Sequence, residues 1–203
     1  MKTLHLRILK TAFSMFITAI GIVMMMKANI GLNPWWTFTF GISQISGIST
    51  GVIVQIFGLI LVFIAYLLGV KPGITTILDM LLIGFYIDFI SKLPLPVPDN
   101  IIIQILVSIM GLIVCCLGLS LTISTGLGAG PKDSFTFAVM SKTNKSINQI
   151  KLIVEGSTFV AGVLIGGPFG IGTIIATLFT GQLLSIFFKK LHYDPALAYK
   201  KNM

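Results

Sequence analysis

Acidic side chains within apolar stretches are the residues of this sequence best suited to chemistry. Glu155 lies about two turns into one such stretch, Asp79 lies similarly deep in another, and Asp88 lies near the far end of that one. An ionisable group inside a bilayer costs about 2.5–3.5 kcal/mol, so it tends to face a partner or water. We expect these residues to couple an ion or proton to another process. The alternatives are pairing of Glu155 with Lys151, one turn earlier, and an interfacial position for Asp88.

The spacing of the titratable residues argues against catalysis. Asp79 and Asp88 are nine residues apart, which places them on opposite faces of a helix, so they cannot act as a catalytic pair. His5 and His192 lie near the two ends of the chain, and the sequence has neither an HExxH nor a GxSxG motif. We therefore expect no catalytic residue and no enzymatic activity.

Composition makes the lipid bilayer the expected solvent. Of 203 residues, 55% are hydrophobic and 10% are charged, with a mean hydropathy of +1.01, whereas soluble domains carry about 25% charged residues. The net charge is +8, but no basic stripe interleaved with aromatic residues exists, so we expect no nucleic-acid binding. Cys115 and Cys116 are adjacent in an apolar run, so we expect packing residues and predict no metal site and no cofactor.

The sequence repeats itself at an offset of 97 residues, without a gap, over about 75 residues. Most of the matched residues are Gly, Pro and Thr, which set backbone shape, so we expect two halves with the same backbone. The first copy has Gly21, Gly31, Pro34, Phe38, Thr39, Phe40, Leu67, Gly69, Gly73, Ile74, Thr76, Ile77, Leu81 and Gly84, and the second has Gly118, Gly128, Pro131, Phe135, Thr136, Phe137, Leu164, Gly166, Gly170, Ile171, Thr173, Ile174, Leu178 and Gly181.

Apolar runs define the elements that must position these residues. About 20 residues are needed to cross a bilayer, and we predict spans near 8–27, 50–70, 73–91, 101–124, 149–166 and 171–188. Trp35–Ile45 and Ser134–Met140 are too short to span, and we expect helices that dip into the membrane or, alternatively, lie flat on it. The predicted fold is an all-α polytopic membrane protein in one domain. Its parts are a first repeat at about 8–91, a proline-rich linker at 92–100, a second repeat at about 101–188 and a tail at 189–203.

Positive charges predict the topology. With a cytoplasmic N-terminus and six crossings, twelve of the fourteen Lys and Arg residues lie inside, as the positive-inside rule requires. Three crossings per repeat make the repeats inverted. Eight crossings would leave eleven of the charges inside and make the repeats parallel, so the charges do not distinguish the two topologies. The length of the apolar segments favours six crossings. The basic, apolar start of the chain is similar to a signal peptide, but Thr11–Ala28 has an internal counterpart, so we expect it to be retained.

The two short helices start alike, at Asn33-Pro34 and Gly130-Pro131, with a cap residue followed by proline. A helix N-terminus favours negative charge, as does a lysine. We therefore predict a substrate site for an anionic or zwitterionic solute between the repeats, formed by Gly31, Pro34, Trp36, Gly128, Gly130, Pro131, Lys132 and Asp133, with Glu155, Asp88 and Asp79 as coupling residues. The alternatives are that these glycines serve turns and close packing, and that the tryptophans are interface anchors.

Motifs in both halves resemble one family. Gly126–Asp133 (GLGAGPKD), Ile150–Glu155 (IKLIVE) and Gly166–Thr173 (GGPFGIGT), with Gly31–Trp35 (GLNPW) in the first half, are similar to the YczE-type bacterial integral membrane proteins, grouped with the YitT and YyaS proteins. The resemblance covers roughly 8–188. It implies a multi-spanning protein of the bacterial plasma membrane in a largely uncharacterised family that is often taken for transporters. The family usually has an acid where this chain has Trp36.

The leading hypothesis is a secondary transporter in the plasma membrane, with both termini cytoplasmic. The alternative is a non-transport scaffold, assembly or sensor subunit that acts with a partner protein. At 203 residues, a homodimer is also plausible on physical grounds, because small transporters often need one to build a pathway.

The six-span topology can be tested by labelling. Single cysteines placed at Pro96 and at Asn144 are expected on opposite sides of the membrane, outside and inside respectively, because one crossing, the span at 101–124, separates them. A membrane-impermeant maleimide added to intact cells should label the first and not the second. Labelling of both positions from one side would reject the six-span topology.

Overall fold

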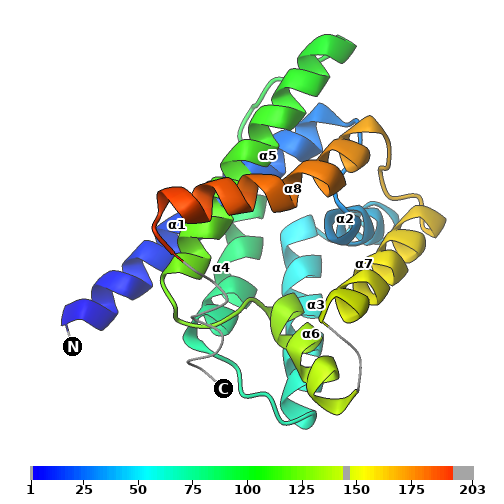
Figure 1. Cartoon of the computed structure of the whole chain (residues 1–203). Coiled ribbons are helices and arrows are strands. Elements are labelled where there is room, and N and C mark those ends of the chain that lie inside the picture. The colour runs from blue at the N-terminus through cyan, green and yellow to red at the C-terminus, as the bar shows by residue number, and fades with distance from the viewer. Residues whose placement is uncertain (1, 144–146, 194–203) are drawn as a thin grey trace.

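The computed structural model describes residues 2–143 and 147–193, which form helices joined by short loops, without a strand among them (Figure 1). The helices are α1 (Lys2–Ala28), α2 (Pro34–Ser46), α3 (Thr50–Leu67), α4 (Ile74–Ser91), α5 (Ile101–Ser124), α6 (Pro131–Lys142), α7 (Ile147–Leu164) and α8 (Ile171–Lys190). The predicted all-helical class is therefore confirmed. Asn144, chosen above for labelling, and residues 194–203 of the predicted tail lie outside the described residues.

The short helices α2 and α6 begin at the two predicted starts. The side-chain oxygen of Asn33 accepts a hydrogen bond from the backbone N–H of Trp36 at 3.1 Å, and Pro34 occupies the first helical position, where no N–H is needed. α6 begins in the same way at Gly130-Pro131, but without a side-chain cap. With 13 and 12 residues, α2 and α6 are about 18–20 Å long, shorter than the roughly 30 Å of bilayer hydrocarbon.

The helices of the first half recur in the second half at the offset of 97 residues. Both short helices begin at the repeated prolines, and α7 begins and ends 97 positions after α3. The crossings between loops recur as well: the N–H of Gly172 donates to the carbonyl of Ile30 at 2.8 Å, and at the corresponding positions the N–H of Thr75 donates to the carbonyl of Leu127 at 3.3 Å. The sequence repeat is therefore also a repeat of backbone structure within the described residues.

The central helix pair, α1 and α5, packs antiparallel. Arg7 and Thr11, near the start of α1, donate hydrogen bonds to the backbone carbonyl and the hydroxyl of Thr125, just after the end of α5. Further along, the two backbones touch at glycines. Gly21 lies against the backbone of Cys115, and Gly118 lies against the backbone of Thr18 in the corresponding contact.

Only glycine permits this spacing of α1 and α5, because a Cβ at Gly21 or Gly118 would overlap backbone atoms of the partner helix. The close contact places the hydrophobic core between the two helices. Its buried members from this pair are Met15, Ala19, Ile22, Val23, Met25, Leu112, Cys115 and Cys116.

Each short helix packs against the opposite half of the chain. α2 packs on α7, where Gly162 lies against the backbone of Phe38, and α6 packs on α3, where Gly58 faces Pro131. The two halves are therefore interlocked, and neither forms a separate unit.

One helix pair breaks the correspondence between the halves. α3 and α4 pack together with Gly51 against Gly84, and the Asp88 carboxylate on α4 accepts hydrogen bonds from the Ser49 hydroxyl and, at 2.8 Å, from the Gly51 N–H. By contrast, α7 and α8 diverge from each other on either side of the loop that joins them and do not pack together (Figure 1). Gly181, the counterpart of Gly84, has no neighbouring atom within 4 Å of where a Cβ would stand.

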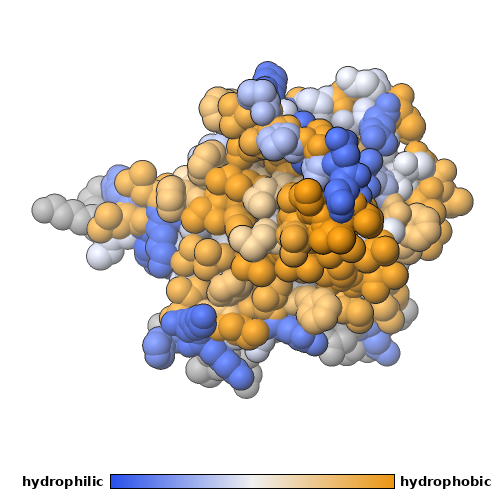
Figure 2. All heavy atoms as spheres, turned by 90° about the horizontal axis from the view of Figure 1, so that it is seen from above, coloured by the Kyte–Doolittle hydropathy of each residue, from blue (hydrophilic) through white to orange (hydrophobic). Residues whose placement is uncertain are grey.

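Within the described residues, five helices are long and apolar enough to cross a membrane: α1, α3, α4, α5 and α8. Hydrophobic residues cover most of the face shown in Figure 2, and hydrophilic residues gather in patches, several of them at its edges. Five of the six predicted spans coincide with these helices, which fits a polytopic membrane protein. The sixth, at 149–166, overlaps α7, which is not one of the five and carries Lys151 and Glu155.

The α1–α5 contact predicts the effect of a side chain at Gly118. Replacing Gly118 with valine is expected to lower the midpoint of thermal unfolding in detergent by about 5–10 °C, because overpacking costs about 1–3 kcal/mol. The matched control is Gly156→Ala on α7, where no atom lies within 4 Å of the added Cβ, and no loss is expected there. Equal midpoints for wild type and Gly118→Val would show that the backbones do not touch as described.

Candidate functional site

A cavity of about 340 Å³ lies where the two halves meet, lined by residues from every one of the eight helices or the loops before them. Its volume is at the lower end of small-molecule sites, which span about 300–1,000 Å³. Both short helices reach the cavity with their N-terminal ends, at Asn33 and Pro34 for α2 and at Gly130 and Pro131 for α6. Two broken-helix starts from different halves therefore share one chamber.

Most of the residues predicted for the site line this cavity. They are Pro34, Trp36, Asp79, Gly128, Gly130, Pro131, Lys132, Asp133 and Glu155. Residues from both repeats, more than 100 positions apart in the sequence in several cases, are thus brought to one place.

Gly31, predicted as a substrate-binding residue, and Asp88, predicted as a coupling residue, do not line the cavity. Gly31 has a φ of 110°, which favours glycine, and a Cβ there would stand 2.6 Å from the backbone nitrogen of Gly170. Gly31 lies in the loop between α1 and α2, where this loop contacts the start of α8. Asp88 is engaged at the start of α3, where it holds α3 against α4. Both residues position the wall of the cavity from outside.

The start of α6 is already occupied by an acidic side chain. Asp79, on α4, lies so close to Gly130 that a Cβ at Gly130 would stand 2.6 Å from its Oδ2. A carboxylate in this place suits the positive end of the helix. The Thr76 hydroxyl, also on α4, donates to the carbonyl of Ala129 at 2.6 Å and fixes the loop before α6. The end of the second short helix is therefore held by residues of the first repeat.

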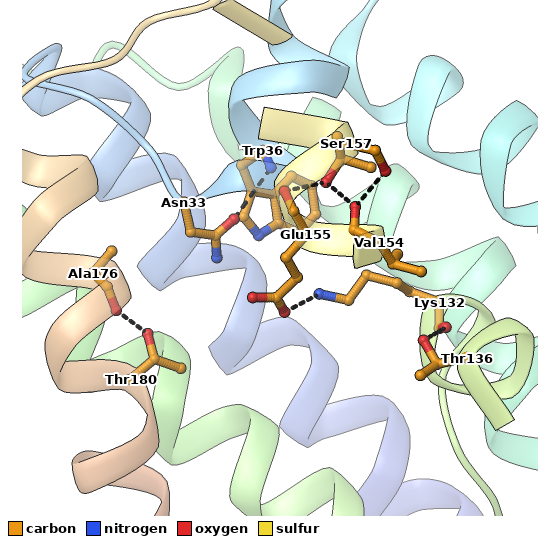
Figure 3. Close-up of polar contacts among 10 residues, drawn as sticks. Asn33, Trp36, Lys132, Thr136, Val154, Glu155, Ser157, Ala176 and Thr180 are labelled. Atoms are coloured by element: carbon orange, nitrogen blue, oxygen red, sulfur yellow. Dashed lines mark hydrogen bonds and ion pairs between the residues drawn. The ribbon is translucent and has the colours of Figure 1, made fainter. Parts of the chain in front are cut away.

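The flank of the cavity carries an ion pair. Lys132, in the first turn of α6, donates to Glu155 on α7 at 3.1 Å, and the two side chains point toward one another in Figure 3. The exposed fractions of the two side chains are 32% and 47%, so solvent screens the pair. Lys151, the partner considered from sequence, also lines the cavity, but the pair forms with Lys132.

Part of the cavity lining is apolar. Trp35 and Trp36 line the cavity together with side chains from α1 and α5, among them Ile22 and Leu112. Trp36 is only 9% exposed and belongs to the hydrophobic core, so it lies inside the protein and does not serve as an anchor at the lipid surface. The cavity lining thus combines charged side chains from α4, α6 and α7 with apolar side chains from α1, α2 and α5.

Two threonines on the cavity wall were not predicted. Thr75 and Thr122 are 2% and 6% exposed, both line the cavity, and their hydroxyl oxygens have no hydrogen-bond partner. A buried polar group left unpaired costs about 1–3 kcal/mol. Threonine hydroxyls in helices usually bond to the carbonyl one turn earlier, so their sequence positions carry no signal of this kind. Cys115 and Cys116, expected to be packing residues, are buried and unpaired and also line the cavity.

The ion pair predicts a measurable coupling. In a double-mutant cycle with Lys132→Met and Glu155→Gln, we expect the free energies of unfolding to couple by about 0.5 kcal/mol, the range of solvent-exposed pairs, and to couple less at high salt. The control cycle replaces Lys151 with methionine in place of Lys132 and is expected to show weaker coupling. Additive effects of Lys132→Met and Glu155→Gln would mean that the pair is absent in solution.

The comparisons place the chain among proteins of unassigned activity. Residues 5–189 match the family of unknown function DUF6198. The uncharacterized membrane protein YczE of Bacillus subtilis is 31% identical over 172 residues, which cover 84% of this chain and 80% of that protein. An uncharacterized protein of Haemophilus influenzae is 25% identical over 93% of this chain and 86% of its own length. The uncharacterized protein YyaS of Bacillus subtilis is 23% identical over 84% of this chain and 87% of its own length.

No solved structure matches the chain. The resemblance noted in the sequence is confirmed by these matches, since both YczE and YyaS are among the relatives. The chain belongs to the DUF6198 family of YczE-type membrane proteins.

Proposed function

We propose that the chain is a secondary transporter of a small zwitterionic solute in the bacterial plasma membrane. The observation that carries the proposal is the cavity itself: it is shared by both halves, and the N-terminal ends of two broken helices open into it. Discontinuous helices that meet at the interface of two repeats are typical of the substrate sites of secondary transporters.

The proposed topology is a pair of inverted repeats. α1 and α5 are counterparts in the repeat and yet run antiparallel, which supports opposite orientations of the two halves in the bilayer. The lengths of α2 and α6 support re-entrant helices, and α7 crosses as the counterpart of α3. With six crossings, the positive-inside rule favours cytoplasmic termini.

The unequal helix pairs support alternating access. α3 and α4 are closed against each other through Gly51 and Gly84, whereas α7 and α8 stand apart, with cavity-lining residues such as Glu155 and Thr180 on both of them. Two inverted halves in different conformations give a cavity open on one side only. An exchange of the two conformations would open it on the other side.

Of the two solute classes considered from sequence, the charges favour a zwitterion over a pure anion. The Lys132 ammonium is paired with Glu155, and the start of α6 has the Asp79 carboxyl beside it. The two groups expected to attract an anion are therefore engaged within the protein. A scaffold subunit, the other candidate, has no need of a charged chamber in its interior.

Transport is testable in proteoliposomes by counterflow. Vesicles loaded with a panel of unlabelled zwitterions, such as neutral amino acids, are expected to accumulate the matching radiolabelled solute. Asp133→Asn and Glu155→Gln should each lower the rate about tenfold or more, because ionisable residues within membrane-embedded helices commonly line the path of the transported solute. The control is Asp99→Asn in the exposed linker, which makes the same chemical change away from the cavity. Full activity in both cavity variants would contradict the assignment of these residues to the site. If no solute accumulates, the proposal of transport is contradicted.

A further inference from the structure

Two acidic side chains of the cavity lack a cationic partner. In the part of the chain that the structure describes, the ion pair is Lys132–Glu155, which leaves Asp79 and Asp133 without one. Both line the cavity. Asp133 lies in the first turn of α6, and Asp79 lies beside the residue that precedes that helix. The two carboxyl groups therefore face one part of the chamber from different repeats.

A second observation at the same place also calls for a ligand. Thr75 precedes Asp79 by four residues on α4, so the two side chains share a helix face. The Thr75 hydroxyl is buried, lines the cavity and has no hydrogen-bond partner, and the same holds for Thr122 on α5. A hydroxyl oxygen and two carboxyl groups are all acceptors for N–H donors. The chamber thus presents acceptors for which the described part of the chain provides neither an ion pair nor, at the two threonines, a hydrogen bond.

A metal ion fits this set of groups poorly. Among the described residues, no group of three or more His, Cys, Asp and Glu side chains is placed to hold one. An ammonium group instead offers three N–H donors and one positive charge, which matches two carboxyls and a hydroxyl. Trp36, Ile22 and Leu112 also line the cavity and suit an apolar body.

Resting on the proposed function, we infer that the cavity recognises the protonated amine of a small solute with an apolar body. The amine lies between Asp79 and Asp133, the Thr75 hydroxyl accepts a further hydrogen bond, and the body packs against Trp36 and its apolar neighbours. An amino acid and a simple alkylamine share this chemistry. Asp79 and Asp133 are thereby binding residues for the cationic end of the substrate.

The chain carries its own probe for this site. It has two tryptophans, Trp35 and Trp36, and both line the cavity, so intrinsic fluorescence reports on its occupancy. Four ligands with the same branched body separate the contributions of charge: isopentylamine, leucine, 4-methylpentanoate and isopentyl alcohol. Each is titrated into the full chain in lipid nanodiscs.

The amine, the amino acid or both are expected to change the fluorescence saturably, with a Kd about tenfold or more below that of the carboxylate and the alcohol, as loss of a buried charge partner requires. Asp79→Asn and Asp133→Asn should each raise the Kd for the bound amine about tenfold or more, and Thr75→Val should raise it several-fold, roughly the effect of one lost hydrogen bond. Asp99→Asn should leave it unchanged. Thr75→Val keeps the shape of the side chain and serves if an Asp variant fails to fold.

The inference is overturned if the carboxylate binds as tightly as the amine, or if none of the four ligands alters the fluorescence. It is also overturned if folded Asp79→Asn binds the amine like wild type. If Asp79→Asn does not fold, the same outcome with folded Thr75→Val overturns it. Amine binding without uptake in vesicles would support the proposed amine site and contradict the proposal of transport. Uptake of a solute without any preference for an amine would support transport and contradict the proposed amine site.

Discussion

The antiparallel contact between α1 and α5 is the constraint on which the other helices depend. Because Gly21 and Gly118 let the two backbones touch, the halves are held head to tail along one axis. The loops that follow these helices then cross the opposite half, where Gly172 bonds to Ile30 and Thr75 bonds to Leu127. Each short helix therefore packs against the other half, and its N-terminal end lines the shared cavity.

The halves agree in the residues that shape the backbone and differ in the residues that line the cavity. Unmatched positions include Trp35 and Trp36 against Lys132 and Asp133, Gly58 against Glu155, and Asp79 against Ala176. The two halves thus share many of their glycines and prolines, while these cavity side chains differ. The combination of charged and apolar side chains in the cavity follows from this divergence.

Much of the fold could be predicted from the sequence, because the repeat and the cap-proline pairs Asn33-Pro34 and Gly130-Pro131 are local signals. The meeting of Pro34, Pro131 and Lys132 at one cavity followed from the expected symmetry. What could not be predicted depends on tertiary contacts. Asp88 was predicted as a coupling residue, but only the packing of α3 on α4 reveals its hydrogen bond to Gly51. Likewise, the pairing of Glu155 with Lys132 rather than Lys151 depends on how α6 meets α7.

The most direct measurement is the distance between matched spin labels on the closed and the open helix pairs. Phe63 and Leu81 on α3 and α4 are exposed, as are Val160 and Leu178, their counterparts on α7 and α8, so labels there report equivalent distances in the two halves. Cys115 and Cys116 are first replaced with alanine. If the two halves exchange conformations around a common site, saturating isopentylamine will shorten the distance between 160 and 178 and lengthen that between 63 and 81. Movement of both pairs in the same direction, or of neither, would contradict the exchange.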